Sequence, residues 1–292
     1  MVRRRSRRAS SGRQAEPIVS SIGVPALRGH KRRNGAAPLV MITAYDEPTA
    51  RYADAAGVDI LLVGDSLANV VLGHEDTLHV TVADMAHHVR AVAAASPRAH
   101  LVADMPWLSY HVGADAAVAN AGELIRAGAQ SVKLEGGAIR REVVRALIDA
   151  EIPVMGHLGL TPQSVLAFGG YKVQAKTRDA VKLLVEDALV LQNAGVYSIV
   201  IEGVPRAVGT ELTAALDVPT IGIGAGPDTD GQVLVLHDIL GLTRRRAPKF
   251  VRPYADLGAA MTDAVSRYAA DVRDGTFPSV AESYDNPEEL LD

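Results

Sequence analysis

The chain of 292 residues contains no cysteine. Disulfide bridges, thiolate metal sites and cysteine nucleophiles are therefore all excluded. It also has no apolar stretch that approaches the roughly 18 residues needed to cross a membrane. A secretory signal is not expected, because the apolar segment at residues 18–24 is short and is interrupted by serines and a glycine. Since 48% of the residues are hydrophobic, the chain can bury a large core in one domain.

Positive charge is concentrated at the amino end of an otherwise acidic chain. Residues 1–16 hold six arginines and one glutamate, a charge of +5, and because the whole chain carries −4, the remainder carries −9. An acidic body argues against nucleic acid as the main partner. We expect residues 1–20 to form a disordered basic extension. Binding of this extension to an anionic surface and a role in organelle targeting are the alternatives.

Three acidic residues each close a short apolar run. Asp65 follows residues 61–63, Asp104 follows residues 101–103, and Glu135 follows residues 132–134. Apolar runs that end on a carboxylate are typical of the active rim of a parallel barrel, where functional groups come from the carboxyl ends of the strands.

Eight apolar segments predict strands, and helix-length stretches separate most of them. The strands are expected at residues 38–43, 61–63, 101–103, 132–134, 152–157, 198–202, 218–223 and 232–237. Helices are expected at residues 82–95, 114–127, 140–150 and 179–194. Eight such units match an α/β fold, a (β/α)8 TIM barrel, here spanning residues 21–285 with a tail at 286–292. A doubly wound open sheet gives similar local signals and is the alternative.

Lys133 and Glu135 are two residues apart, so in a strand they point to the same face, whereas Val132 and Leu134 point to the other. Buried charges on that face cost several kcal/mol unless they are paired or bind a metal. If Asp65 and Asp104 converge there with Glu135, a bound cation keeps all three ionised, and carboxylate oxygens favour Mg2+. The alternative is that each acid caps the helix that follows it.

Two further residues of this rim could move a proton. Glu202 closes a predicted strand and His157 closes another, and environment can bring either side chain toward a neutral pKa. The alternatives are a core histidine at position 157 and a helix cap at position 202. The glycines at 222, 224 and 226 do not fit a dinucleotide motif, because Pro227 occupies the place of its third glycine, and they better suit a tight turn or close backbone approach to a ligand.

An ordered series of motifs occupies residues 40–278. It comprises TAYD at 43–46, LVGDS at 62–66, ADMPW at 103–107, VKLEGG at 132–137, GHLGLTPQS at 156–164, GGYKVQ at 169–174, EGVP at 202–205, IGIGAG at 221–226 and DGQVLV at 230–235. In this order the motifs resemble the ketopantoate hydroxymethyltransferase family. The resemblance implies a barrel of the phosphoenolpyruvate/pyruvate superfamily type.

The resemblance also implies an activity and a set of roles. The enzyme would transfer a hydroxymethyl group from methylene tetrahydrofolate to 2-oxoisovalerate through a Mg2+-stabilised enolate, giving ketopantoate in pantothenate biosynthesis. Mg2+ would be held by Asp65, Asp104 and Glu135. The substrate would be bound by Asp65, Ser66, Asp104, Lys133 and His157, the last with its precise role open. Glu202 would be the general base, and the protein would be a cytoplasmic homodecamer.

Two segments depart from the family pattern. Residues 175–177 (AKT) stand where the family has a glycine-led turn, and Glu282 stands where it tends to have a histidine. No local pattern identifies residues that contact folate. The competing interpretations are a carbon–carbon lyase or mutase of the same superfamily, whose members often use a cysteine, and a scaffold that has kept the barrel without its catalysis.

Overall fold

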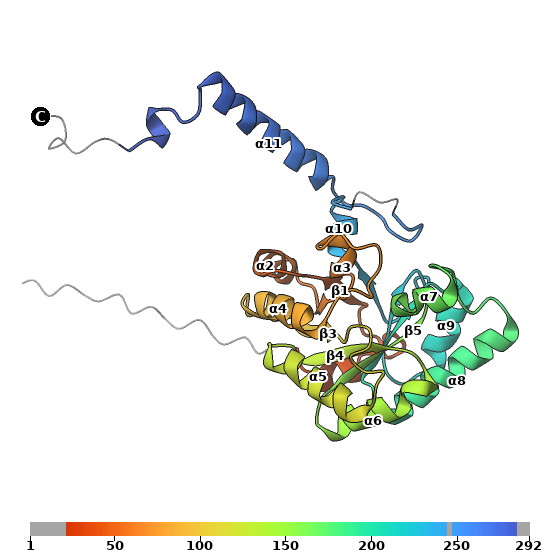
Figure 1. Ribbon diagram of the computed structural model, residues 1–292. Helices are drawn as coiled ribbons and strands as arrows, with labels where there is room; N and C mark the ends of the chain where they lie inside the picture. Colours follow the sequence, from red (N-terminus) through yellow and green to blue (C-terminus); the bar gives the residue numbers. More distant parts are fainter. Residues whose placement is uncertain (1–21, 244–246, 285–292) are drawn as a thin grey trace, which may run out of the picture.

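A computed structural model describes residues 22–243 and 247–284. Its centre is a closed barrel of eight parallel strands in sequence order, in which β8 pairs with β1 (Figure 1). The TIM barrel prediction is confirmed, and the open doubly wound sheet is wrong because the first and last strands are hydrogen-bonded to each other. The extension predicted for residues 1–20 and the tail predicted for residues 286–292 lie outside the described residues.

The elements follow the order expected for a βα barrel. The strands are β1 (Leu39–Thr43), β2 (Ile60–Val63), β3 (His100–Asp104), β4 (Ser131–Glu135), β5 (Val154–Gly159), β6 (Ser198–Glu202), β7 (Thr220–Ile223) and β8 (Gly231–Leu234). The longer helices are α2 (Glu47–Ala55), α4 (Val82–Ala93), α5 (Ala114–Arg126), α6 (Arg141–Asp149), α8 (Arg178–Ala194), α9 (Arg206–Ala215) and α11 (Leu257–Asp274). Shorter helices are α1 (Val24–Arg28), α3 (Leu67–Val70), α7 (Val165–Phe168), α10 (Leu236–Ile239) and the 3-10 turns η1 (Arg32–Asn34), η2 (Ala138–Arg140), η3 (Pro162–Ser164) and η4 (Val280–Glu282).

Some strand boundaries differ from the sequence prediction. β5 and β7 each begin just after a proline, Pro153 and Pro219, because proline has no N–H to give to a neighbouring strand. The strand predicted for residues 232–237 is too long, since β8 ends at Leu234 and α10 follows. The backbone N–H of Leu236 donates to Thr43 Oγ1 at 3.0 Å, and this bond fixes the chain where the strand ends.

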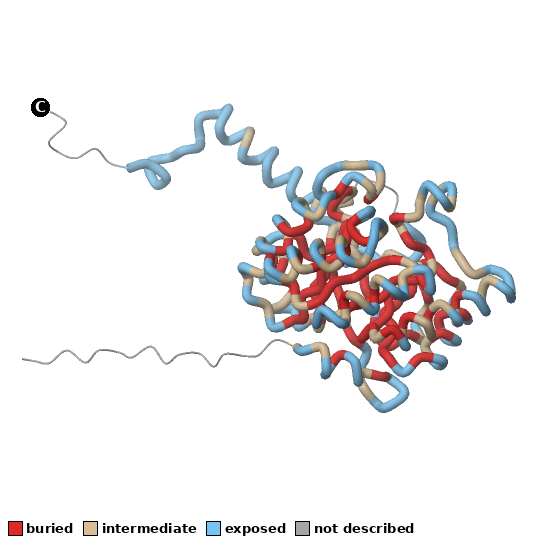
Figure 2. The backbone as a smooth tube through the Cα atoms, turned by 60° about the horizontal axis from the view of Figure 1, so that its bottom comes forward, coloured by how far each residue is buried: buried red, intermediate tan, exposed pale blue. Residues whose placement is uncertain are grey.

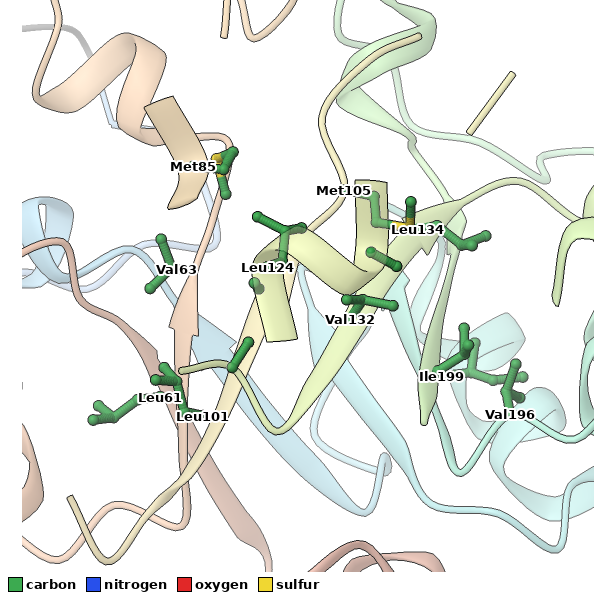
Figure 3. Packing of buried hydrophobic residues seen from close by; sticks show 14 of the residues in the cluster. Leu61, Val63, Met85, Leu101, Met105, Leu124, Val132, Leu134, Val196 and Ile199 are labelled. Atoms are coloured by element: carbon green, nitrogen blue, oxygen red, sulfur yellow. The ribbon is translucent and has the colours of Figure 1, made fainter. Parts of the chain in front are cut away.

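Side chains alternate between two apolar layers. In β2, Leu61 and Val63 belong to the outer layer together with helix side chains such as Met85 (Figure 3). Leu62, between them, belongs to the inner layer. β4 follows the same rule, because Val132 and Leu134 belong to the outer layer. Val132 and Leu134 therefore share one face of the strand, and the prediction is confirmed for this apolar pair.

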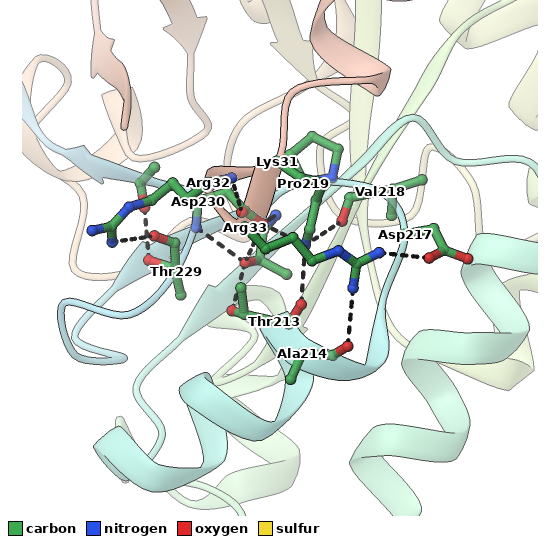
Figure 4. A network of polar contacts seen from close by, with 12 residues as sticks. Lys31, Arg32, Arg33, Thr213, Ala214, Asp217, Val218, Pro219, Thr229 and Asp230 are labelled. Carbon is green, nitrogen blue, oxygen red and sulfur yellow. Dashed lines mark hydrogen bonds and ion pairs between the residues drawn. The ribbon is translucent and has the colours of Figure 1, made fainter. Parts of the chain in front are cut away.

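The amino-terminal end of the barrel is closed by a buried ion pair (Figure 4). Lys31 Nζ lies 2.6 Å from Asp230 Oδ2, and both side chains are almost fully buried. Asp230 also accepts hydrogen bonds from the backbone N–H groups of Arg32 at 2.9 Å and Thr220 at 3.0 Å. The segment before β1 is thereby tied to the starts of β7 and β8, at the end of the barrel opposite to the predicted acidic rim.

The last long helix, α11, differs from the others. None of its 18 residues is buried, and it extends away from the barrel (Figures 1 and 2). On the barrel itself Val40 of β1 is 50% exposed. Within the described part of the chain, no helix is both long enough and apolar enough to span a membrane.

Candidate active site

The predicted site residues meet in one cavity at the carboxyl ends of the strands. Asp104 and Glu135 are the last residues of β3 and β4, Glu202 is the last residue of β6, and Asp65 lies just beyond β2. The cavity has a volume of about 110 Å3. Its lining includes every residue that the sequence singled out, namely Asp65, Ser66, Asp104, Lys133, Glu135, His157 and Glu202. The structure therefore brings together residues that are spread over more than a hundred positions.

Lys133 is the cation at the centre of this acidic group. Its Nζ lies 2.8 Å from Asp104 Oδ1 and 3.1 Å from His157 Nδ1, and its side chain is buried. Burial opposes protonation, but the carboxylates of Asp104, Glu135 and Asp65 outweigh it and raise the pKa of Lys133 above its ordinary value. A permanently charged ammonium group is therefore held inside the barrel, on the face opposite to Val132 and Leu134.

Gln163, which the sequence patterns did not single out, holds two of the acids. This residue lies in η3, directly after β5, and its Nε2 donates to Asp65 Oδ2 at 2.8 Å while its backbone N–H donates to Glu135 Oε2 at 3.0 Å. The Tyr110 hydroxyl donates to Gln163 Oε1 at 2.6 Å and accepts from the Glu135 N–H at 3.2 Å. Gln163 sits within the GHLGLTPQS motif, but no periodicity or charge pattern pointed to it.

The helix-cap alternative for the acids is wrong. Side-chain caps are provided elsewhere, for example by Asp46 for α2, Thr81 for α4 and Thr177 for α8. The helices that follow the three acids begin after Ser66, Gly113 and Arg140, none of which forms a side-chain cap bond. The cap proposed for position 202 is also wrong, because α9 begins after Pro205 without a side-chain cap.

Burial and the neighbouring carboxylates perturb the pKa of Asp65. Burial raises the pKa of Asp65 well above its usual range, the neighbouring Asp104 and Glu135 raise it further, and Lys133 and Gln163 oppose the shift. Asp104 is fixed by accepting the Asp65 backbone N–H at 3.0 Å through Oδ2. Its Oδ1 is buried without a well-aligned hydrogen bond, although Lys133 lies close to it.

The donor set suits a hard cation in its chemistry. Three carboxylates provide the oxygen ligands that Mg2+ prefers, and they outnumber the single ammonium group of Lys133 beside them. As the side chains stand, however, no group of three or more His, Asp or Glu residues in ranges 22–243 and 247–284 is arranged to hold a metal ion. Gln163 and Lys133 occupy acceptor positions of the acids, so metal binding requires local side-chain adjustment.

His157 connects two of the acids. Its Nδ1 lies 3.3 Å from Glu135 Oε1 and its Nε2 lies 3.1 Å from Glu202 Oε2. Burial and the Lys133 ammonium oppose protonation, but the two carboxylates outweigh them and raise the pKa of His157 to about 9. His157 is buried, yet its ring faces the cavity rather than the apolar core.

The glycine-rich segment after β7 forms a turn and not a nucleotide-binding helix start. Gly224 and Gly226 have φ values of +61° and +86°, and the chain then leads directly to β8. A Cβ atom at Gly224 would lie 2.6 Å from the ring of Phe250. The dinucleotide interpretation is therefore wrong, and the expected tight turn is confirmed.

The two departures from the family pattern have local explanations. Ala175 has a φ of 51°, the left-handed conformation that glycine adopts at lower cost, so the chain keeps a turn there without glycine. Thr177 caps α8 through the N–H of Ala180. Glu282 completes a capping box with Ser279, accepting its N–H at 2.8 Å.

The fold and this cavity define a TIM-barrel enzyme whose acidic site lies at the carboxyl ends of the strands. A family model described as ketopantoate hydroxymethyltransferase matches residues 22–280. The chain therefore belongs to the ketopantoate hydroxymethyltransferase family, and it is a hydroxymethyltransferase.

Individual relatives agree with this assignment. The chain is 52% identical over 276 residues to 3-methyl-2-oxobutanoate hydroxymethyltransferase 2 of Bradyrhizobium diazoefficiens, covering 94% of each chain. It is 53% identical to the 3-methyl-2-oxobutanoate hydroxymethyltransferase of Syntrophobacter fumaroxidans, covering 89% of this chain and 92% of the relative.

Solved structures share the fold at low identity. One is a 2,3-dimethylmalate lyase of the PEP mutase/isocitrate lyase superfamily, with a TM-score of 0.57, 19% identity and 92% coverage of both chains. Another is a phosphonopyruvate hydrolase in complex with oxalate and Mg++, with a TM-score of 0.55, 16% identity and coverage of 89% of this chain and 92% of that one.

Proposed function

We propose that the protein transfers a hydroxymethyl group from methylene tetrahydrofolate to 2-oxoisovalerate, giving ketopantoate for pantothenate biosynthesis. The observation that carries this proposal is the cavity of about 110 Å3, which suits a small acid and joins three carboxylates, a buried ammonium group and Glu202. The names of the relatives support 3-methyl-2-oxobutanoate as the acceptor.

We assign the binding of the 2-oxo acid to the inner part of this cavity. Asp65, Asp104 and Glu135 would hold Mg2+, which when bound supplies positive charge to the 2-oxo group of the substrate. The binding of oxalate and Mg++ by the phosphonopyruvate hydrolase of the same fold is consistent with this arrangement. Lys133 neutralises the substrate carboxylate as a point charge. Ser66, whose Oγ lies 2.8 Å from the Tyr45 hydroxyl, provides a further polar contact.

Glu202 is the group that we assign to proton removal. It lines the cavity, and its Oε2 lies 3.1 Å from His157 Nε2. The carboxylate takes the C3 proton, and the resulting carbon nucleophile forms a bond to the methylene carbon of the folate as one of the two C–N bonds of that carbon breaks. Water then displaces the second nitrogen and supplies the hydroxyl oxygen, and the C3 proton and one proton of the water end on the two nitrogens of the tetrahydrofolate that leaves.

Replacement of Glu202 by Gln tests this assignment. The variant keeps the shape of the side chain, so it should bind 2-oxoisovalerate nearly normally, but it should lose about two to four powers of ten in rate. Exchange of the C3 hydrogen with deuterated water reports the proton step without folate turnover. Glu211→Gln on the exposed face of α9 is the matched control. Normal exchange in Glu202→Gln would reject the assignment and transfer the role to His157.

We also propose that the chain assembles with copies of itself. The exposed apolar side chains of α11 and the half-exposed Val40 on the barrel are the observations that support it. The family resemblance suggests a decamer.

A further inference from the structure

A second cavity opens outward from the acid-lined one. This outer chamber has a volume of about 770 Å3, within the range of sites that enclose an extended organic ligand. The two cavities share the lining residues Asp65, Ser66, Pro162, Glu202, Ile223 and Val235. Because Glu202 borders both, a molecule in the outer chamber reaches the same groups as a small acid in the inner one.

The walls of the outer chamber are largely apolar and come from three regions of the chain. Leu160 and Val173 contribute from the segments after β5, and Val204 contributes from the segment after β6. Phe250, whose side chain is 37% exposed, lies against the backbone at Gly224. A flat aromatic ligand could pack against such a surface, with an aromatic ring on one side.

One wall carries a hydroxyl group without a partner. Thr77 is only 2% exposed, lines the outer chamber, and its Oγ1 has no hydrogen-bond partner among residues 22–243 and 247–284. An unpaired buried hydroxyl is costly, so such groups usually meet a partner in the functional state. A ligand that presents ring N–H and carbonyl groups provides that partner.

Two lysines border the outer chamber at exposed positions. Lys172 and Lys249 come from segments far apart in the sequence, and both residues are exposed. Lys172 Nζ donates to the Phe168 carbonyl at 3.0 Å, which holds it beside the chamber. Arg206 also lines the chamber but is paired with Asp228 at 3.1 Å. The two lysines are therefore the cations best placed to meet anionic groups of a ligand.

We propose that the outer chamber binds the folate donor, an inference that rests on the proposed function. The pterin lies inward, where Thr77 hydrogen-bonds to it and its methylene carbon faces the substrate next to Glu202. The glutamate tail points outward, and its carboxylates meet Lys172 and Lys249. The size of the chamber, its apolar walls, the unpaired hydroxyl and the two cations each match one part of this donor.

The lysines are tested with the variant Lys172→Gln/Lys249→Gln. Its KM for methylene tetrahydrofolate should rise roughly tenfold, because two exposed charge contacts are lost, while kcat changes little. C3 hydrogen exchange of 2-oxoisovalerate should be unaltered. With methylene tetrahydropteroate, which lacks the glutamate, the variant and the original protein should have the same KM. Lys182→Gln, on the exposed surface of α8, is the control.

The hydroxyl is tested with Thr77→Val, which keeps the shape of the side chain. If Thr77 serves the donor, this variant should gain thermal stability, because an unpaired buried hydroxyl is removed, and its KM for the donor should rise about fivefold. Thr77→Ser should restore the original KM. A lower melting temperature with an unchanged KM would show that the hydroxyl is structural and would overturn its role in binding.

The outcomes separate the two proposals. If the original protein forms ketopantoate but the lysine variant keeps its KM for the donor, the chamber assignment fails and the proposed function stands. If the original protein exchanges the C3 hydrogen but forms no product with methylene tetrahydrofolate, the donor is wrong and both proposals fail.

Discussion

The orientation of Asp65 and Glu135 depends on two neutral residues, Tyr110 and Gln163. The Tyr110 hydroxyl donates to Gln163 Oε1, so the amide nitrogen of Gln163 must face Asp65. If the amide were reversed, its oxygen would face the carboxylate and repel it. A short chain of hydrogen bonds therefore sets the direction of two proposed metal ligands, as is common around metal sites.

Removal of this hydroxyl in Tyr110→Phe should weaken the site without abolishing the fold. Mg2+ affinity and turnover should fall about 10- to 100-fold, the usual effect of losing a group that orients metal ligands. The free energy of unfolding should fall by about 1 to 3 kcal/mol, because Gln163 Oε1 and the Glu135 N–H lose a buried partner. Calorimetry with Mg2+ and urea unfolding measure the two effects. Tyr254→Phe, at a position that is 70% exposed, is the control. If Tyr110→Phe leaves the Mg2+ affinity unchanged, the role of Tyr110 is purely structural.

His100, at the start of β3, is a buried histidine with a fixed tautomer. Its Nδ1 lies 2.9 Å from the Ile22 carbonyl, which can only accept, so Nδ1 carries the proton. Its Nε2 lies 2.9 Å from Ser131 Oγ, and the Tyr197 hydroxyl lies 2.9 Å from the same oxygen. Burial lowers the pKa of His100 to about 4, although the bond to Ile22 opposes the shift.

This lowered pKa predicts a loss of stability in acid. An unfolded histidine has a pKa near 6.5, so below that value the unfolded chain takes up a proton that the folded chain refuses. The contribution is fully present above about pH 6.5 and is lost as the pH falls toward 4, by up to about 3 kcal/mol. Urea unfolding at pH 7, 5.5 and 4 should show a steeper decline for the original protein than for His100→Gln. Equal declines would mean that His100 is not the group responsible.

At the scale of the elements, the ends of strands were predictable where an acidic residue closes the apolar run. The acids at the ends of β3 and β4 close apolar runs, so the sequence placed Asp104 and Glu135 correctly. The end of β8 was not predictable in this way, because the apolar pattern continues to His237. Just beyond the end of the strand, the backbone N–H of Leu236 donates to the hydroxyl of Thr43, which lies 193 positions earlier in the chain. A local sequence pattern cannot reveal a contact between residues so far apart.

The ion pair of Lys31 and Asp230 is an element-scale contact of the same kind. It joins the segment before β1 to the loop between β7 and β8, and burial lowers the pKa of Lys31 although Asp230 opposes the shift. Lys31→Met should cost about 3 to 5 kcal/mol of unfolding free energy, because the carboxylate of Asp230 is left buried without its cation. Lys31→Met/Asp230→Asn should recover part of that loss. The exposed pair of Arg33 and Asp217 is the control, and Arg33→Met should cost at most about 1 kcal/mol. Equal losses at positions 31 and 33 would contradict the argument.

At the scale of the whole molecule, the barrel was predictable because eight strand patterns and their helices repeat along the chain. The outer chamber was not predictable, since it is assembled from segments after five different strands that share no motif. Gln163 was missed for a related reason: a neutral amide has no periodicity, and its role arises only when β5 brings it next to Asp65 and Glu135.

The helix α11 raises the remaining question at this scale. Its exposed apolar residues form one stripe, because their spacings of three and four positions keep them on a single helix face. The stripe consists of Leu257, Met261, Val265, Tyr268 and Val272. An isolated helix of 18 residues is only marginally stable in water, and its apolar stripe is expected to be buried against another protein surface. A second copy of the chain provides that surface in the proposed assembly.

Charges placed on the stripe should therefore break the assembly without unfolding the barrel. Met261→Asp/Val265→Asp should reduce the mass measured by sedimentation, while the melting of the barrel persists because α11 contributes no buried residue to it. Ser266→Asp/Ala270→Asp adds the same charge on the opposite face of α11 and should leave the mass unchanged. If the stripe variant and this control sediment alike, α11 does not form the interface, and the contact between copies must be sought on another surface, beginning with the half-exposed Val40 of β1.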